Sequence, residues 1–375
     1  MKSKSIFKIV LIMVVLISLV SCDVIIKKPK KCTVTFNGNG STSGEMVSQV
    51  VEYNTDLKLS PIEYKIGDIK ASQWATDPTG KFLIDDEATI RVTEDMTLYA
   101  YWGDNQPFTI HFLDKEGQVK LHTRTGETDI IYTVNGGELV HLTSTTDIDV
   151  PANSVISFYA VRTENDSLNF KCTENCTVFG NVMSLIYGDD FTDPTKTDLF
   201  EEAFYNLLKG NTGLTDASNL ILPSMTLAEG CYDSMFQNCS YLVSAPKLPA
   251  TNLAKGCYMS MFMACVRLKK APELPATTLQ YACYYDMFKD CKSLKKAPVL
   301  AAPVLAPYCY DEMFQNCTKL KYVKCLATNT DATDCTFRWL YNVTTEDGTF
   351  VRDPSKHWAY DSERGVPKGW EIIDN

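Results

Sequence analysis

Histidine is scarce in this chain. The only four, His111, His122, His141 and His357, show no spacing typical of a zinc site or of the base that activates a nucleophile. The chain also lacks a Gly-x-Ser-x-Gly nucleophile motif and a glycine-rich phosphate loop. We therefore expect a protein that is not an enzyme and that holds no cofactor and no metal.

An excess of positive charge is also missing. Lys and Arg number 36 against 46 for Asp and Glu, which gives a formal net charge of −10. Phosphate backbones would be repelled overall, so no nucleic acid partner is expected. With 375 residues and 45% hydrophobic content, the chain is long enough to form two or three domains with real cores.

The apolar run near the N-terminus is too short for a permanent membrane span. Residues 9–17 are uninterruptedly apolar, follow three lysines and lead into Leu19-Val-Ser-Cys22. This segment resembles the signal peptide and lipobox of bacterial lipoproteins, which implies cleavage before Cys22 and acylation of that residue. The alternative is an ordinary signal peptide with a chance cysteine. We expect residues 1–22 to be the signal peptide with the lipidated Cys22, and 23–31 to be a linker.

What the chain does have is a repeat of 26 residues. Four units open at Cys231, Cys257, Cys283 and Cys309, and each continues with Tyr, Met, Phe, a second Cys and Leu at fixed offsets. The second cysteines are Cys239, Cys265, Cys291 and Cys317. Degenerate copies stand before and after, at residues 203–214 and from Cys335 onward. One unit is too small to bury a core, so successive units are expected to stack.

Within a unit, the spacing predicts one helix and one strand. Leu227, Cys231 and Met235 are four residues apart, as on one face of a helix. Prolines follow Leu268 and favour an extended strand. The motif Cys-Tyr-x-x-Met-Phe-x-x-Cys-x-x-Leu, followed by Ala-Pro-x-Leu-Pro-Ala-Thr, resembles the BspA-type leucine-rich repeats of bacterial surface proteins. This resemblance implies an α/β leucine-rich-repeat solenoid at 198–345, with a C-terminal cap at 346–375.

Two β-rich stretches precede the repeats. Residues 32–103 alternate apolar and polar positions and end in Leu98-Tyr-Ala-Tyr-Trp102, with Trp74 three residues before Asp77. They resemble the internalin-type B repeat, also called the Listeria-Bacteroides repeat, which implies a small β-grasp-like fold that serves as a stalk or spacer. Residues 107–190 contain three further strand patterns and an Asn135-Gly-Gly turn, and we expect a small β-sandwich there. The fold class is therefore multidomain: all-β N-terminal modules followed by the α/β solenoid.

The repeat cysteines are predicted to pack rather than react. If a helix ran between the two cysteines of a unit, their Cα atoms would be about 12 Å apart, beyond disulfide reach. We expect two ladders of free, buried thiols along the stack. Disulfides within units remain the alternative for an exported protein. Cys172 and Cys176 alone are a weak candidate for zinc.

Lysines form the candidate binding stripe. Lys269, Lys295 and Lys321 are 26 residues apart, and Lys270 and Lys296 stand beside the first two. Stacking would bring all five into one basic stripe that suits an anionic glycan or protein. The alternative is a solvated face that protects strand edges from aggregation. The repeated tyrosines could likewise stack on sugars or pack in the core.

Together these features predict a non-catalytic lipoprotein of the cell envelope. We expect it in the outer membrane, held by its lipid anchor and exposed at the surface, where the repeat surface serves adhesion or binding to host or extracellular proteins or glycans. One alternative is a structural surface-layer component without an external ligand. Another is an accessory of an envelope polysaccharide hydrolase.

Overall fold

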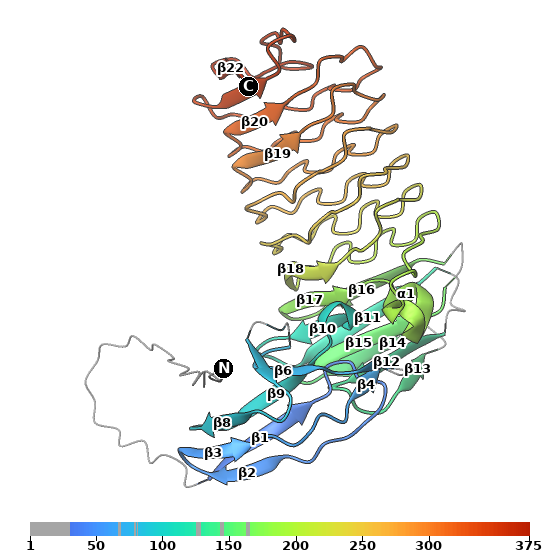
Figure 1. The fold of residues 1–375 in the computed structure, drawn as a ribbon. Coiled ribbons are helices and arrows are strands. Elements are labelled where there is room, and N and C mark those ends of the chain that lie inside the picture. The colour runs from blue at the N-terminus through green and yellow to red at the C-terminus, as the bar shows by residue number, and fades with distance from the viewer. Residues whose placement is uncertain are drawn as a thin grey trace, which may run out of the picture.

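The computed structural model describes residues 31–375, except 67–68, 79, 81, 125–128, 143–145 and 163–165. The predicted signal peptide, Cys22 and all but the last residue of the predicted linker lie outside the described residues. The fold is nearly all β and bends into an open arc, with two β modules at one end and a long stack of repeats at the other (Figure 1).

The first module is a mixed β-sheet with two small hairpins beside it. Its main sheet has the order β2-β1-β9-β6-β7, and β1 pairs in parallel with β9. Alternate residues of β1 are buried, and Phe36 packs on Trp74 with 4.8 Å between ring centroids. The described part of the module contains no α-helix. Its strands are β1 (Lys31–Asn37), β2 (Gln49–Glu52), β3 (Thr55–Lys58), β4 (Lys65–Ile66), β5 (Ile69–Lys70), β6 (Gln73–Ala75), β7 (Leu83–Asp85), β8 (Thr89–Val92) and β9 (Met96–Tyr101).

The second module packs two sheets face to face. A sheet of order β13-β12-β15-β10-β17-β18 faces the sheet β14-β11-β16. Phe170 of the smaller sheet lies 5.2 Å from Phe108 and 4.7 Å from Phe158 of the larger one, between ring centroids. Its strands are β10 (Phe108–Phe112), β11 (Gly117–Thr123), β12 (Ile130–Val134), β13 (Val140–Leu142), β14 (Thr146–Val150), β15 (Val155–Ala160), β16 (Leu168–Cys172) and β17 (Cys176–Asn181).

Short helical turns flank this module. The 3-10 helix η1 (Gly103–Asn105) links it to the first module, and α1 (Ser184–Tyr187) and η2 (Gly188–Thr192) follow its last strand. The module does not end there as a sheet, because β17 pairs in parallel with β18 (Leu214–Ile221). The larger sheet therefore runs on into the repeats and covers their first unit.

Buried polar contacts hold the first two modules together. The Trp102 indole N–H donates to the Asn39 carbonyl at 2.9 Å, and the Tyr159 hydroxyl donates to the Gly40 carbonyl. Asn37 donates its amide to the Asn135 side chain at 3.2 Å. Because these donors reach backbone carbonyls from a second module, the junction is a fixed interface rather than a free hinge.

The repeat array, residues 200–345, stacks one unit on the next. On one side, short extended segments pair in parallel from unit to unit, as in the bridges Asp216↔Ser244 and Ser244↔Lys270. Later in the array they lengthen into the sheet β19-β20-β21-β22, whose strands are β19 (Lys296–Leu300), β20 (Tyr322–Cys325), β21 (Thr349–Arg352) and β22 (Glu371–Asp374). We call this the strand side, and it faces the inside of the arc (Figure 1).

The predicted α/β leucine-rich-repeat solenoid is wrong. No α-helix occurs in the array, and the stretches expected to be helical are turn segments at 201–210, 229–238, 255–264, 281–290, 307–316 and 333–342. In the first regular unit, Met235 N–H donates to Tyr232 O at 3.3 Å, closing a β-turn. The next donor along, Phe236 N–H, reaches Met261 O of the following unit at 2.9 Å. Donors thus alternate between the local turn and the neighbouring unit.

Backbone angles show the same four-residue rhythm. Gly230, Ser234 and Asn238 have positive φ values of 57°, 56° and 62°, and corresponding residues of the other turn segments do so too. Such angles are incompatible with a right-handed helix. A chain of turns with a period of four places Leu227, Cys231 and Met235 on one side just as a helix would, which is why the spacing was misleading.

Stacked side chains fill the interior of the array. Tyr232, Tyr258, Tyr284 and Tyr310 form one buried column, with ring centroids 5.6 to 6.1 Å apart. A phenylalanine column runs beside it, with spacings of 5.3 to 5.6 Å. At the C-terminal end Trp339 stacks on Tyr310 and packs against Trp358 at 5.2 Å. Residues 346–375 therefore close the core while β21 and β22 extend the sheet.

Truncating one ring of this column should weaken the whole array. We expect Phe262→Ala to lower the free energy of unfolding by about 3–5 kcal/mol, because the ring is fully buried between two others. Val304→Ala is the matched control, since that side chain is 58% exposed. Urea unfolding followed by circular dichroism measures both, and equal stability of the two variants would contradict the stacked core.

Candidate binding surface

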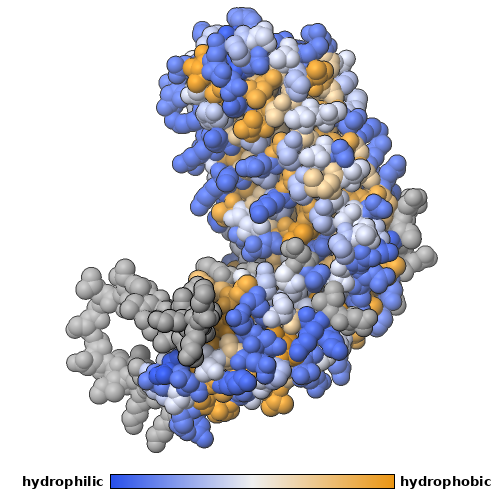
Figure 2. All heavy atoms as spheres, viewed as in Figure 1, coloured by the Kyte–Doolittle hydropathy of each residue, from blue (hydrophilic) through white to orange (hydrophobic). Residues whose placement is uncertain are grey.

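The strand side brings the predicted lysines together. The Lys321 N–H donates to Lys295 O at 2.9 Å, so these residues lie on adjacent extended segments. Lys269 N–H reaches Val243 O at 3.4 Å in the same way, and Lys270 and Lys296 follow in the chain. All five lysines are exposed. We call them the lysine column, and Figure 2 shows hydrophilic residues along this inner side of the arc.

Two members of the column have partners. Lys321 Nζ lies 2.8 Å from a carboxylate oxygen of Asp347, which comes from the next segment of the stack. Lys296 Nζ lies 4.6 Å from the centroid of the Tyr322 ring. The C-terminal end of the column is therefore partly neutralised, which the sequence pattern alone did not reveal.

The other three lysines lack such partners. Among the described residues, no carboxylate forms an ion pair with Lys269, Lys270 or Lys295. Extended segments in a sheet are about 4.8 Å apart, so these ammonium groups repel one another. A bound anion would relieve that repulsion.

The tyrosines are not available for sugars. Tyr232, Tyr258, Tyr284 and Tyr310 are each at most 2% exposed and stack on one another inside the array. Burial raises the pKa of each phenol well above its usual value. Of the two roles considered for them, the structure places them in core packing.

The repeat cysteines lie in the same interior. Cys231, Cys257, Cys283 and Cys309 form one column and Cys239, Cys265, Cys291 and Cys317 another, all free and buried. The thiols of the second column donate to backbone carbonyls at 3.1 Å, as Cys239 does to Leu208. Burial raises the pKa of Cys239 to about 12, so the reactive thiolate is strongly disfavoured there.

The turn side carries an acidic cluster that sequence reasoning missed. Lys289 Nζ lies 3.3 Å from Asp286 and also pairs with Glu312 of the next unit, while Asp311 is buried beside them without a hydrogen bond to one of its oxygens. Burial first, and the Glu312 charge second, raise the pKa of Asp311 to about 7. The available signal was the change from Ser234 and Ser260 to Asp286 and Glu312 at one repeat position.

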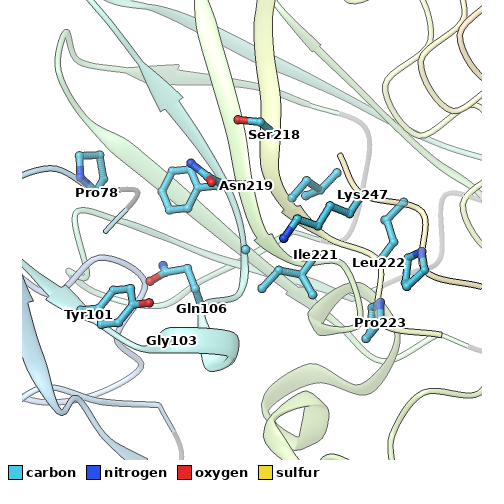
Figure 3. Close-up of a pocket in the computed structure, with 14 residues that line it drawn as sticks. Pro78, Tyr101, Gly103, Gln106, Ser218, Asn219, Ile221, Leu222, Pro223 and Lys247 are labelled. Atoms are coloured by element: carbon cyan, nitrogen blue, oxygen red, sulfur yellow. The ribbon is translucent and has the colours of Figure 1, made fainter. Parts of the chain in front are cut away.

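A cavity opens where the three parts of the molecule meet. Its volume is about 370 Å³, and it lies next to the first unit of the array. Tyr101 comes from the first module, Gln106 from the connection, Ser218 and Asn219 from β18, and Lys247 from the first repeat (Figure 3). No sequence pattern pointed to it, because its residues lie up to 150 positions apart and share no motif.

The histidines remain scattered. His111 is in β10 and His122 in β11, whereas His141 lies 3.2 Å from Asp129 at the surface. Within the described ranges, no group of three or more His, Cys, Asp or Glu side chains could hold a metal ion. Nor does any helix in that part of the chain have the length and apolar character needed to cross a membrane.

Comparison with known proteins identifies one module. Residues 33–101 match the family model of the Listeria-Bacteroides repeat domain, which confirms the resemblance noted from the sequence. This repeat is typical of extracellular or surface proteins. No curated protein and no solved structure matches the chain.

Protonation of Asp311 should stabilise the array. Its pKa is about 7 when folded and about 4 when unfolded, so its contribution is fully present below pH 4 and is lost as the pH rises through 7. We expect Asp311→Asn to flatten the fall in unfolding free energy between pH 5 and 8, and to be about 1–2 kcal/mol more stable than the parent at pH 8.

The matched control is Glu273→Gln, an exposed carboxylate of the same array. Denaturant midpoints at several pH values measure the effect. If Asp311→Asn and the parent kept parallel pH profiles, the buried carboxyl would not be protonated in this range.

Proposed function

We propose that this protein is a non-catalytic lipoprotein of the cell envelope that presents the lysine column to an extracellular anionic polymer, such as an acidic glycan, or to an acidic protein surface. The observation that carries the proposal is the group of exposed, unpaired lysines, Lys269, Lys270 and Lys295, on adjacent segments of the strand side. A regular spacing of like charges suits a ligand whose own charges repeat along a chain.

The charge distribution supports selectivity. The whole chain carries a net charge of −10, so a general anion is repelled and only one that reaches the column is held. The column also lies on the inner side of the arc, where a long ligand could contact several units at once (Figure 1). Repeat arrays use such extended surfaces for large partners.

The order of the modules supports display away from a membrane. The Listeria-Bacteroides repeat lies between the N-terminus and the array, so an anchor at Cys22 would be followed by two β modules before the lysine column. The likeness of the 26-residue motif to repeats of bacterial surface proteins is a second support. Three acyl chains, if added as in bacterial lipoproteins, would hold the protein stably.

Neutralising the unpaired lysines should remove polymer binding. We expect the triple variant Lys269→Gln, Lys270→Gln and Lys295→Gln to bind an anionic polysaccharide roughly 10- to 100-fold more weakly, because each exposed ion pair is worth about 0.5–1 kcal/mol. Heparin affinity chromatography and a glycan array with sulfated and carboxylated chains measure the change.

The control variant removes the same charge elsewhere. Lys292, Lys319 and Lys368 are exposed and lie outside the lysine column, so changing them to Gln alters net charge equally. Equal loss in both triple variants would mean that only net charge matters. Absence of binding by the parent protein, together with self-association, would favour a structural surface-layer role.

The anchor is tested separately. We expect cells that express the parent chain to incorporate a clickable palmitate analogue into it, whereas Cys22→Ala should abolish labelling and release the protein from the membrane fraction. Cys32→Ala is the control, since that cysteine is buried in β1 of the folded module. Labelling that survives Cys22→Ala would contradict lipidation at this residue.

A further inference from the structure

The cavity at the junction of the three parts is a second site, separate from the lysine column. It is a built feature, since its walls come from elements fixed to one another. The Gln106 side chain donates to the Asn39 carbonyl and accepts from the Asn39 amide at 3.2 Å. On the other side, β17 pairs with β18, which supplies residues 218–221 of the lining. Its shape is therefore present before any ligand arrives.

The lining combines one positive charge with flat apolar surfaces. None of the residues that line it is acidic, and Lys247 is its only charged side chain. The Lys247 ammonium and the Tyr101 hydroxyl point into the same open space (Figure 3). Pro78, Pro223 and Pro249 add apolar faces around it.

Specific local contacts hold these groups in place. The Tyr101 ring lies flat against Gly80, where a Cβ would come within 2.4 Å of it. Ser218 donates its hydroxyl to Asp216 at 2.6 Å, which leaves its oxygen to accept a hydrogen bond from the cavity side. Asn219 is exposed and offers both a donor and an acceptor.

We propose that this cavity binds a carboxylated monosaccharide, either free or at the end of a glycan chain. One carboxylate matches the single ammonium of Lys247, the C–H face of a pyranose matches Tyr101 and the prolines, and the hydroxyls match Ser218 and Asn219. A phosphate ester fits less well, because a doubly charged group would meet one cation and no cluster of arginine donors. The volume of about 370 Å³ lies within the range of small-ligand sites.

Titration with glucuronic acid tests the proposal on the full mature chain. We expect a Kd of about 1 mM by calorimetry and saturation-transfer NMR, with at least tenfold weaker binding of its methyl ester and of glucose. Lys247→Met should weaken binding about tenfold. Asn219→Asp should do the same by repulsion, and because Asn219 is exposed this change leaves folding intact.

Controls separate this site from the lysine column. Asn175→Asp places the same charge at the far end of β17 and should keep full affinity. The triple variant of the column should also keep it, so failure of one site is distinguishable from failure of the other. Equal binding of the methyl ester, tighter binding of hexanoate, or an unchanged Kd in Lys247→Met would overturn the proposal.

Discussion

Hydrogen bonding between neighbouring turn segments is the constraint on which the array depends. Tyr232, Ser234 and Phe236 each donate their N–H to a carbonyl 25 positions later, while the donors between them close local turns. A helix would use all of these groups internally and leave none for the next unit. The constant unit length follows, because one inserted residue would shift every later donor away from its acceptor.

This constraint also explains the side chains and the unusual backbone. Alignment places like residues above one another, so aromatic rings stack and cysteines form columns. Positive φ at every fourth residue is imposed even where local preference opposes it, as at Tyr308 and Arg338, which have φ values of 58° and 47°. Each such residue costs on the order of 1–2 kcal/mol, which the bonds to the neighbouring unit offset.

The sequence predicted what depends on periodicity. The stacking of units, the inward position of the cysteines and the alignment of the lysines all follow from a repeat of 26 residues. It misled where two structures share a spacing, since a turn period of four and a helical period of 3.6 differ little over eight residues. Gly230, Gly256 and the Asn or Asp at positions 238, 290 and 316 were the available signals of left-handed backbone. Contacts between distant residues, such as Lys321 with Asp347 or Tyr101 with Lys247 across the cavity, have no sequence signature at all.

Because each unit exchanges hydrogen bonds only with its two neighbours, the units are interchangeable parts. Removing one copy, or duplicating one by unequal recombination between near-identical stretches of the gene, would leave every remaining column aligned and both ends still covered by the second β module and the tryptophan-rich closing segment. The length of the arc, and with it the number of lysines on its inner side, can therefore change in whole steps over evolutionary time without any redesign of the fold.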